Sequence, residues 1–431
     1  MKLYSTNDKD NQVDLKEAVL NAFPKDKGLY MPESISKLPQ SFFDNIEQFS
    51  FAELAFIVAQ NIIGDYLSEK DIYRIVHRSI NFPAPLIELD ENISTLELFH
   101  GPSMAFKDFG ARFMAELMSH FLKDEERVTT ILVATSGDTG GAVASGFFNV
   151  PGIEVIILYP SGKVSPLQEK QLTTWGKNIK AVEVDGVFDD CQRLVKEAFL
   201  DKDLTRKYKF SSANSINIAR LIPQSFYYFE AYKQVKDKSQ DIFFVVPSGN
   251  FGNLTAGLFA KKMGLPVKQF IAATNLNRTV PDYLETGEYK ARPSVQTISN
   301  AMDVGDPSNF SRMKELYGST WNMMKKDITA YSYNDHQTKE GLTELKHKKS
   351  YTADPHGAVA YLACKEHMQK EKGQYIFLET AHPGKFLDVV ESTLNSKVEM
   401  PTKLSDFMSK KKTSQACSNQ FKDFKNLLLN L

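Results

Sequence analysis

Short apolar runs recur along the chain and are separated by longer stretches of mixed polarity. From residue 93 onward the runs that stand out are 93–99, 130–134, 153–158, 181–184, 243–246, 270–273 and 375–378. Most of the intervals between them are long enough for a crossover helix, which two parallel strands of one sheet require. The pattern therefore predicts a mainly parallel, doubly wound α/β architecture.

The polar and apolar patterning also predicts how the chain is divided. Residues 1–92 show helical patterns around 15–23 and 51–63 but none of the candidate chemistry, so we expect an appended N-terminal domain there. A charged and polar break at 236–241 is expected to separate two α/β lobes, 93–236 and 237–400. Residues 401–431 offer no recognisable motif, and we expect them to form a C-terminal tail.

Composition narrows the classes of protein that fit. The chain has 431 residues, of which 42% are hydrophobic and 24% charged, so it can bury a large core. The net charge of −1 gives no electrostatic attraction to nucleic acid or to an anionic membrane. No stretch reaches the ~18 consecutive apolar residues of a membrane span, and the polar start of the chain does not resemble a secretory signal. The three widely spaced cysteines cannot all pair within a monomer, which favours a reducing cytoplasm.

Several kinds of site are disfavoured because their motifs are missing from the sequence. The chain contains no HExxH or CxxC pair, so we expect no metal site. It also contains no GxSxG, no GxxxxGK[ST] and no GxGxxG. These absences disfavour a serine hydrolase, a P-loop nucleotide hydrolase and a Rossmann dehydrogenase.

Lys107 is the one cation in the segment 103–111, whose other residues, except the acidic neighbour Asp108, are apolar or small. Burial disfavours the ammonium form of a lysine, so a buried Lys107 would lose its proton more easily and could act as a nucleophile. The alternative is an ordinary surface lysine whose charge is balanced by Asp108 in solvent.

Three further clusters follow apolar runs and support the functional reading of Lys107. They are 135–141, 247–253 and 379–384. Glycine-rich turns before a helix bring backbone N–H groups close to an anion, and open α/β sheets bind ligands at the carboxyl ends of their strands. Each loop taken alone could equally be a simple turn between a strand and a helix, in which glycine only relieves backbone strain.

At this point the residues resemble a known family. The window from Glu97 through Ser103 to Ala111 looks like the pyridoxal-phosphate attachment signature of the serine/threonine dehydratase group, called fold type II. Within that group the chain is similar to the threonine synthases of the long form. The similarity rests on five motifs in order, namely 101–108, 136–140, 214–217 with Arg220, 247–253 and 380–383, and it extends from residues 3–6 to about residue 385.

The resemblance implies two α/β lobes with pyridoxal 5'-phosphate between them, and it implies a role for each motif. Lys107 would attach the cofactor and act as the catalytic base. The other cofactor-binding residues would be Phe106, Gly249, Asn250, Phe251, Gly252, Asn253 and Thr380. Thr380 would face the pyridine nitrogen, because the rival Glu379 is its strand neighbour and should point the opposite way.

The resemblance also implies the substrate, O-phospho-L-homoserine, which would react with water to give L-threonine and inorganic phosphate. Its carboxylate and part of its side chain would be bound by Ser136, Gly137, Asp138 and Thr139. Its phosphate would be bound by Asn214, Ser215 and Arg220, since an arginine fork matches a phosphate in shape and charge.

The sequence leaves two alternative functions open, and it does not decide the oligomeric state. One is another fold type II enzyme such as a serine/threonine dehydratase, against which Arg220 argues because such an enzyme handles no substrate phosphate. The other is a catalytically silent homologue, against which the intact Lys107 and glycine loops argue. We expect a monomer or a homodimer with no nucleic-acid or membrane partner.

Overall fold

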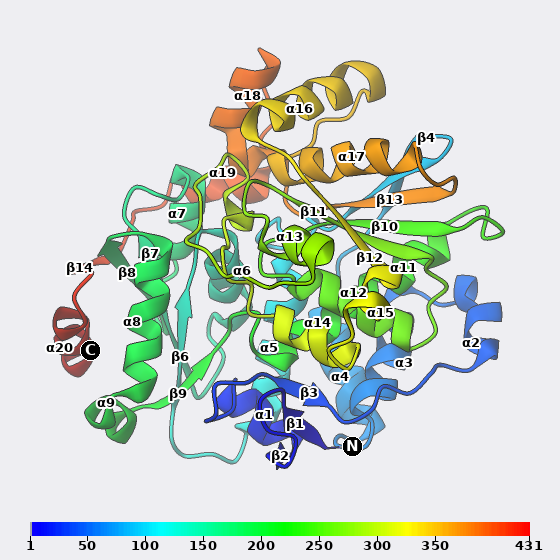
Figure 1. Ribbon diagram of the computed structural model, residues 1–431. Helices are drawn as coiled ribbons and strands as arrows, with labels where there is room; N and C mark the ends of the chain where they lie inside the picture. Colours follow the sequence, from blue (N-terminus) through cyan, green and yellow to red (C-terminus); the bar gives the residue numbers. More distant parts are fainter. Residues whose placement is uncertain (1) are drawn as a thin grey trace.

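The computed structural model describes residues 2–431. Its N-terminal part, drawn in blue in Figure 1, is a small antiparallel sheet with helices around it. The sheet has the order β2-β1-β3, formed by β1 (Leu3–Ser5), β2 (Gln12–Val13) and β3 (Tyr30–Pro32). The helices of this part are α1 (Leu15–Asn21), α2 (Gln40–Asp44), α3 (Phe51–Ile63) and α4 (Glu69–Ser79), with a 3-10 turn η1 (Ile46–Gln48).

Helix α3 shows how the sequence fixes this part. Ser50 and Glu53 form a capping box, in which Glu53 N donates to Ser50 Oγ at 3.3 Å and Ser50 N donates to Glu53 Oε2 at 2.8 Å. The buried residues recur at helical spacing, at Leu54, Val58 and Ile62. This face packs against α11 (Phe226–Gln234), so the N-terminal part is joined to the rest of the molecule by an apolar contact.

A six-stranded sheet lies at the right of Figure 1 and has the order β12-β11-β10-β13-β5-β4. All neighbouring strands are parallel except the edge pair β4 and β5. The strands are β4 (Leu86–Asp90), β5 (Ile93–Glu97), β10 (Ile242–Pro247), β11 (Gln269–Thr274), β12 (Ile328–Ser332) and β13 (Gln374–Glu379). Helix α17 (Pro355–Met368) packs across β10, β11 and β13.

A five-stranded, wholly parallel sheet lies at the left of Figure 1 and has the order β14-β8-β7-β6-β9. Its strands are β6 (Thr129–Ala134), β7 (Ile153–Pro160), β8 (Ile179–Asp185), β9 (Lys209–Ser212) and β14 (Gln415–Ser418). Helices α6 (Asp138–Phe147), α7 (Pro166–Thr173) and α8 (Phe188–Leu200) pack against its strands, and α5 (Lys107–Phe121) packs against α6.

Both faces of the five-stranded sheet are buried. Ile131 and Val133 of β6 belong to the same core cluster as α5 and α6, whereas Leu132 and Ala134 join Leu194 of α8 in another cluster. Alternate residues of a strand point to opposite faces, so helices cover both sides of this sheet. The doubly wound architecture predicted from the sequence is thereby confirmed.

The remaining helices connect these elements. They are α9 (Lys202–Lys207), α10 (Ile218–Leu221), α12 (Gly252–Lys262), α13 (Thr279–Thr286), α14 (Phe310–Leu316), α15 (Trp321–Asp327), α16 (Asp335–Lys349), α18 (Leu387–Leu394), α19 (Thr402–Met408) and α20 (Phe421–Asn430). Three more 3-10 turns are η2 (Ile222–Ser225), η3 (Asn300–Met302) and η4 (Pro383–Phe386).

All seven apolar runs singled out in the sequence are strands, but three strands lie in sheets that the linear division did not predict. One is β4, which was expected within the N-terminal domain and lies at the edge of the six-stranded sheet. β5, expected to begin the first lobe, pairs with β13 of the six-stranded sheet, and Leu96 lies opposite Leu378. β14, expected within a tail, extends the five-stranded sheet, where Cys417 lies opposite Val184. As limits of domains, 1–92, 93–236, 237–400 and 401–431 stay predictions, whereas sheet membership crosses them.

Candidate active site

A cavity of about 230 Å³ is lined by residues from both larger sheets. Its walls include the segments that follow the carboxyl ends of β6, β10 and β13, where ligands of open α/β sheets bind. The sequence-predicted residues that line it are Phe106, Lys107, Ser136, Thr139, Asn214, Ser215, Arg220, Gly249, Asn250, Phe251, Gly252, Asn253 and Thr380. Gly137 and Asp138 are the two predicted residues that do not line it.

Lys107 begins α5 and places its ammonium group in this cavity. Lys107 Nζ lies 5.0 Å from the centre of the Phe106 ring and donates to Thr139 Oγ1 at 3.2 Å. Burial lowers the pKa of Lys107 to about 8, although the nearby Asp138 carboxylate opposes this shift. The amine is therefore far easier to deprotonate than that of a surface lysine.

Asp108 is not the solvated partner that an ordinary surface lysine would have. Its carboxylate is buried and accepts a hydrogen bond from Ser103 N at 2.8 Å. Burial raises the pKa of Asp108 to about 6, against the effect of the Ser103 hydrogen bonds. A Cβ at Gly101 would collide with this carboxylate, which explains why the loop before Lys107 has glycine there.

Thr380 lies beside the lysine loop because the two segments are joined through their backbones. Phe106 N donates to Thr380 O at 2.8 Å, and Ala105 forms an isolated bridge with Ala381. The Thr380 side chain lines the cavity, whereas Glu379 points into the interior and accepts from Asp354 N at 2.6 Å. The two neighbours therefore point in opposite directions, as the strand geometry predicted.

The loop 247–253 is held in shape by its own side chains and by one close packing contact. Asn253 Nδ2 donates to Pro247 O at 2.8 Å, and Phe251 has a left-handed φ of 58° just before α12 begins. A Cβ added to Gly249 would lie 2.7 Å from the carbonyl oxygen of Ala301, so only glycine lets the loop lie against η3. Gly252 and Asn253, which begin α12, line the cavity, and the backbone N–H groups of a helix start can bind an anion.

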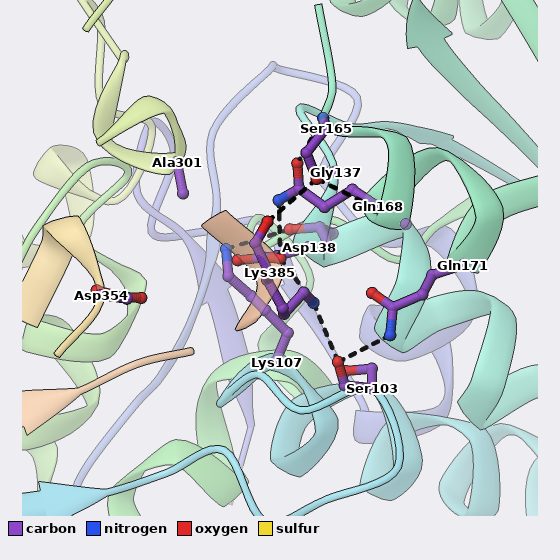
Figure 2. Close-up of polar contacts among 12 residues, drawn as sticks. Ser103, Lys107, Gly137, Asp138, Ser165, Gln168, Gln171, Ala301, Asp354 and Lys385 are labelled. Carbon is purple, nitrogen blue, oxygen red and sulfur yellow. Dashed lines mark hydrogen bonds and ion pairs between the residues drawn. The ribbon is translucent and has the colours of Figure 1, made fainter. Parts of the chain in front are cut away.

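The carboxylate of Asp138 does not line the cavity but forms buried contacts behind it, so a substrate contact of this residue would be through its backbone and stays a prediction. Figure 2 shows its carboxylate bound to Lys385, at 2.7 Å from Nζ, and to Gln168, whose Nε2 donates at 3.0 Å. Both charged side chains are at most 6% exposed. Burial alone would raise the pKa of Asp138, but the Lys385 ammonium holds that pKa below its usual range. Gly137 also has a packing role, because a Cβ there would lie 2.5 Å from the Gln168 side chain.

Lys385 is a buried residue of the site region that sequence reasoning missed. Its Nζ donates to Ser103 O at 3.0 Å, and Gln171 Nε2 donates to the same carbonyl at 3.0 Å (Figure 2). Lys385 thus ties the loop before Lys107 to the loop that begins α6. Its place two residues after His382-Pro383 was the only signal in the sequence, and it does not distinguish Lys385 from a surface lysine.

Asn214, Ser215 and Arg220 line one wall of the cavity. Asn214 Nδ2 donates to Ala134 O at 2.9 Å, and Ser215 Oγ accepts from Asn250 Nδ2 at 2.6 Å. Arg220 is 1% exposed, and its Nη1 donates to the carbonyl of Ala213. Within residues 2–431 neither Nε nor Nη2 of Arg220 has a hydrogen-bond partner. Burial lowers the pKa of Arg220 to about 10, so the side chain is a cation at neutral pH with unused donors.

The segment 300–309 forms another wall that the sequence patterns did not indicate. The cavity is lined there by Asn300, Ala301, Met302, Asp303, Val304, Asp306 and Ser308. His356 also lines it and accepts from Ala301 N at 3.2 Å, while its Nδ1 lies 3.2 Å from Asp354 Oδ2. His356 therefore both makes local hydrogen bonds and forms part of the cavity wall.

The residues present fit pyridoxal 5'-phosphate. A lysine of lowered pKa faces the cavity, a glycine loop at a helix start offers backbone donors, and Thr380 lines the same cavity. No group of three or more His, Cys, Asp or Glu side chains suited to a metal ion occurs within residues 2–431. Among the helices of the same residues, none has the length and apolarity to cross a membrane.

Comparisons with known proteins cover nearly the whole chain and agree with a pyridoxal-phosphate site. Family models match as Threonine synthase N terminus at residues 2–80, Pyridoxal-phosphate dependent enzyme at 81–378, and Threonine synthase, C-terminal at 357–428. Threonine synthase of Escherichia coli is 42% identical, with 100% of each chain covered. Its crystal structure superposes with a TM-score of 0.94.

Two further solved structures show the difference between a likeness of family and a likeness of fold alone. The pyridoxal-phosphate-bound threonine synthase of Brucella melitensis is 33% identical, with a TM-score of 0.91 over 100% of this chain and 99% of that one. A fungal L-serine ammonia-lyase from Rhizomucor miehei is 14% identical and has a TM-score of 0.57 over 73% of this chain and 98% of that one. The second likeness is one of fold alone.

Proposed function

The chain belongs to the threonine synthase family of pyridoxal-phosphate-dependent enzymes, and from this membership we propose that it converts O-phospho-L-homoserine and water into L-threonine and inorganic phosphate. The observation that carries the proposal is one cavity that brings Lys107 together with the glycine loop at Gly249 and with the buried cation Arg220. A serine/threonine dehydratase would have no substrate phosphate for such a cation to bind.

The cofactor would be held by residues on three sides of the cavity. We propose that Lys107 attaches it, that residues 249–253 bind its phosphate, and that Phe106 and Thr380 lie against its ring. When bound, pyridoxal phosphate withdraws electrons from the substrate carbon skeleton, which permits loss of phosphate from Cγ and addition of water at Cβ. The Thr380 hydroxyl is neutral, so it would not hold the pyridine nitrogen protonated as a carboxylate would.

The substrate would be held at both of its ends. Ser136 and Thr139 would bind the α-carboxylate through their hydroxyls and the loop N–H groups, with Gly137 and Asp138 shaping that loop from behind. At the other end, Arg220 would bind the phosphate through its unused guanidinium donors. Asn214 and Ser215 line the cavity near Arg220 and would complete this phosphate site.

Lys107 would transfer protons from and to the substrate. Its pKa of about 8 leaves a useful neutral fraction near neutral pH, so Nζ can accept the proton from the substrate Cα and return one later. The hydrogen bond to Thr139 Oγ1 holds Nζ on the side of the carboxylate-binding loop. The leaving phosphate departs with the electrons of the Cγ–O bond, and the oxygen of water forms the new bond to Cβ.

Turnover of two substrates by the purified protein tests this proposal. With O-phospho-L-homoserine, L-threonine and inorganic phosphate should appear in equal amounts, measured by amino-acid chromatography and a phosphate assay. With L-threonine alone, 2-oxobutyrate should form more slowly. Faster 2-oxobutyrate formation would favour a dehydratase, and no turnover of either compound by cofactor-loaded protein would favour a silent homologue.

We further propose that the protein works in the cytoplasm as a monomer or a homodimer. Its cysteines Cys191, Cys364 and Cys417 are free and buried, which supports a reducing compartment. Light scattering coupled to size-exclusion chromatography would decide between the two oligomeric states. A mass above that of two chains would contradict both.

A further inference from the structure

Arg312 is a fully buried arginine beneath the loop that carries Ser215. It lies on α14, is 0% exposed, and donates hydrogen bonds from all three nitrogens of its guanidinium group. Nη1 donates to Ser215 O at 3.1 Å and Nη2 donates to Ile216 O at 2.6 Å. Nε donates to Tyr30 O at 3.1 Å. Arg312 therefore fixes the carbonyls of the 215–216 turn and joins that turn to the N-terminal sheet.

Each guanidinium nitrogen of Arg312 has a hydrogen-bond partner, but no negatively charged group in the described part of the chain balances the charge of the side chain. All its acceptors are neutral, the fourth being Asn309 Oδ1 at 2.8 Å, and no carboxylate in the described chain pairs with it. Burial lowers the pKa of Arg312 to about 9, so the group is still a cation at neutral pH. A buried charge without a counter-ion is costly, and that cost falls when an anion binds nearby.

Asn309 connects this unbalanced charge to the cavity. While its Oδ1 accepts from Arg312, its Nδ2 donates to Asn250 O at 3.1 Å in the glycine loop. A Cβ on Gly252 would lie 3.5 Å from Asn309 Nδ2 and 3.3 Å from Ser215 Cβ. The glycine loop itself contains no lysine or arginine. Arg312 is thus the buried cation directly behind the place where the two phosphate-binding loops meet.

We propose that Arg312 is a positioning residue that, through Asn309 and Ser215, supplies positive charge for a phosphate group bound between the loops 214–216 and 249–253. The proposal rests on the function proposed above, which places two phosphates in this cavity, one on the cofactor and one on the substrate. Either phosphate has the required chemistry, and the two are distinguished by measurement.

The sharpest test changes Asn309 and leaves Arg312 in place. Asn309→Asp gives Arg312 a carboxylate partner, and Asn309→Ala is its matched control, because both variants lose the Nδ2 donor to Asn250 and only Asp neutralises the charge. Cofactor retention of the holoenzyme is followed by visible absorbance during dialysis. The inhibition constant for inorganic phosphate and the KM for O-phospho-L-homoserine are measured with cofactor in excess.

Asn309→Asp should lose cofactor at least about tenfold faster than Asn309→Ala if the cofactor phosphate is the one stabilised. It should instead show an inhibition constant and a KM raised by about tenfold if the substrate phosphate is. In both cases its melting temperature should equal or exceed that of Asn309→Ala, because the new ion pair stabilises the fold. Equal phosphate-binding behaviour in the two variants would overturn the proposal.

A second pair of variants tests the charge at Arg312 itself. Arg312→Lys keeps the charge and Arg312→Met removes it, while both lose the guanidinium fork. The lysine variant should retain cofactor or phosphate affinity better than the methionine variant, and equal affinities would contradict the role of charge. Cofactor retention does not depend on which reaction the enzyme performs, so a failure of that measurement is distinct from a failure of the substrate assignment.

Discussion

Replacement of Arg220 by alanine should remove most of the catalytic efficiency with O-phospho-L-homoserine and leave the cofactor in place. The Arg220 guanidinium is buried and has used one donor group, on the Ala213 carbonyl. Its Nε faces Gly110, where a Cβ would lie only 2.6 Å away, so Nη2 is the group left to bind a ligand.

The expected loss follows from the number of donors that remain. One or two hydrogen bonds from a charged donor to a phosphate, at about 1.5–3 kcal/mol each, span roughly 1.5–6 kcal/mol, and we expect a loss near the middle of that range, roughly 2–4 kcal/mol. At about 1.4 kcal/mol for each factor of ten, kcat/KM should fall roughly 30- to 1000-fold. Arg220→Lys keeps the charge without the planar fork and should lie between the wild type and Arg220→Ala.

Phosphate release at several substrate concentrations gives kcat/KM for the wild type and both variants. The visible spectrum of the bound cofactor is the control, because Arg220 is proposed to contact the substrate phosphate only. A folded, cofactor-loaded Arg220→Ala protein with kcat/KM within about threefold of wild type would refute the reasoning. Arg220 would then be a structural residue that holds the Ala213 carbonyl.

Variants at three other places test the remaining parts of the site, namely at Lys107, in the loop 249–253 and in the Lys385–Asp138 pair. Lys107→Ala should lose the visible band that borohydride abolishes in the wild type, and a reduced cofactor mapped to another lysine would refute its role. Gly252→Asp should weaken cofactor binding strongly by adding a carboxylate at the phosphate loop, with Asn253→Ala milder, as measured by cofactor titration. Lys385→Met should lower the free energy of unfolding by about 3–5 kcal/mol, since Asp138 is left buried and unpaired, and a further Asp138→Asn change should recover part of it in urea titrations.

The gathering of these side chains in one cavity was predictable because most of them lie in contiguous motifs. Lys107, Ser136 and the loop 249–253 each follow a strand or precede a helix, and strand order brings such ends together. The opposite directions of Glu379 and Thr380 followed from strand geometry alone. In these cases the position along a strand or helix decides where the side chain points.

Contacts between distant segments were not predictable in this way. Nothing near Asp138 in the sequence indicates that Lys385 will neutralise it, and Arg312 has no local motif at all. Gly110 is a similar case, since its lack of a side chain leaves room for Arg220 rather than for a turn. Which charges are buried together depends on tertiary packing, and a pattern of polar and apolar residues does not carry that information.

The pairing of β14 with β8 has a consequence for the order in which the molecule assembles. The last residue of β8, Asp185, is synthesised early. The outer edge of β8 has no partner until residues 415–418 have been synthesised, which happens after all strands of the six-stranded sheet. An unpaired strand edge can join other chains, and contacts between residues far apart in sequence form slowly. During synthesis on the ribosome, the part of the molecule that carries Thr139 therefore stays open to aberrant association for longest, and its last strand closes it.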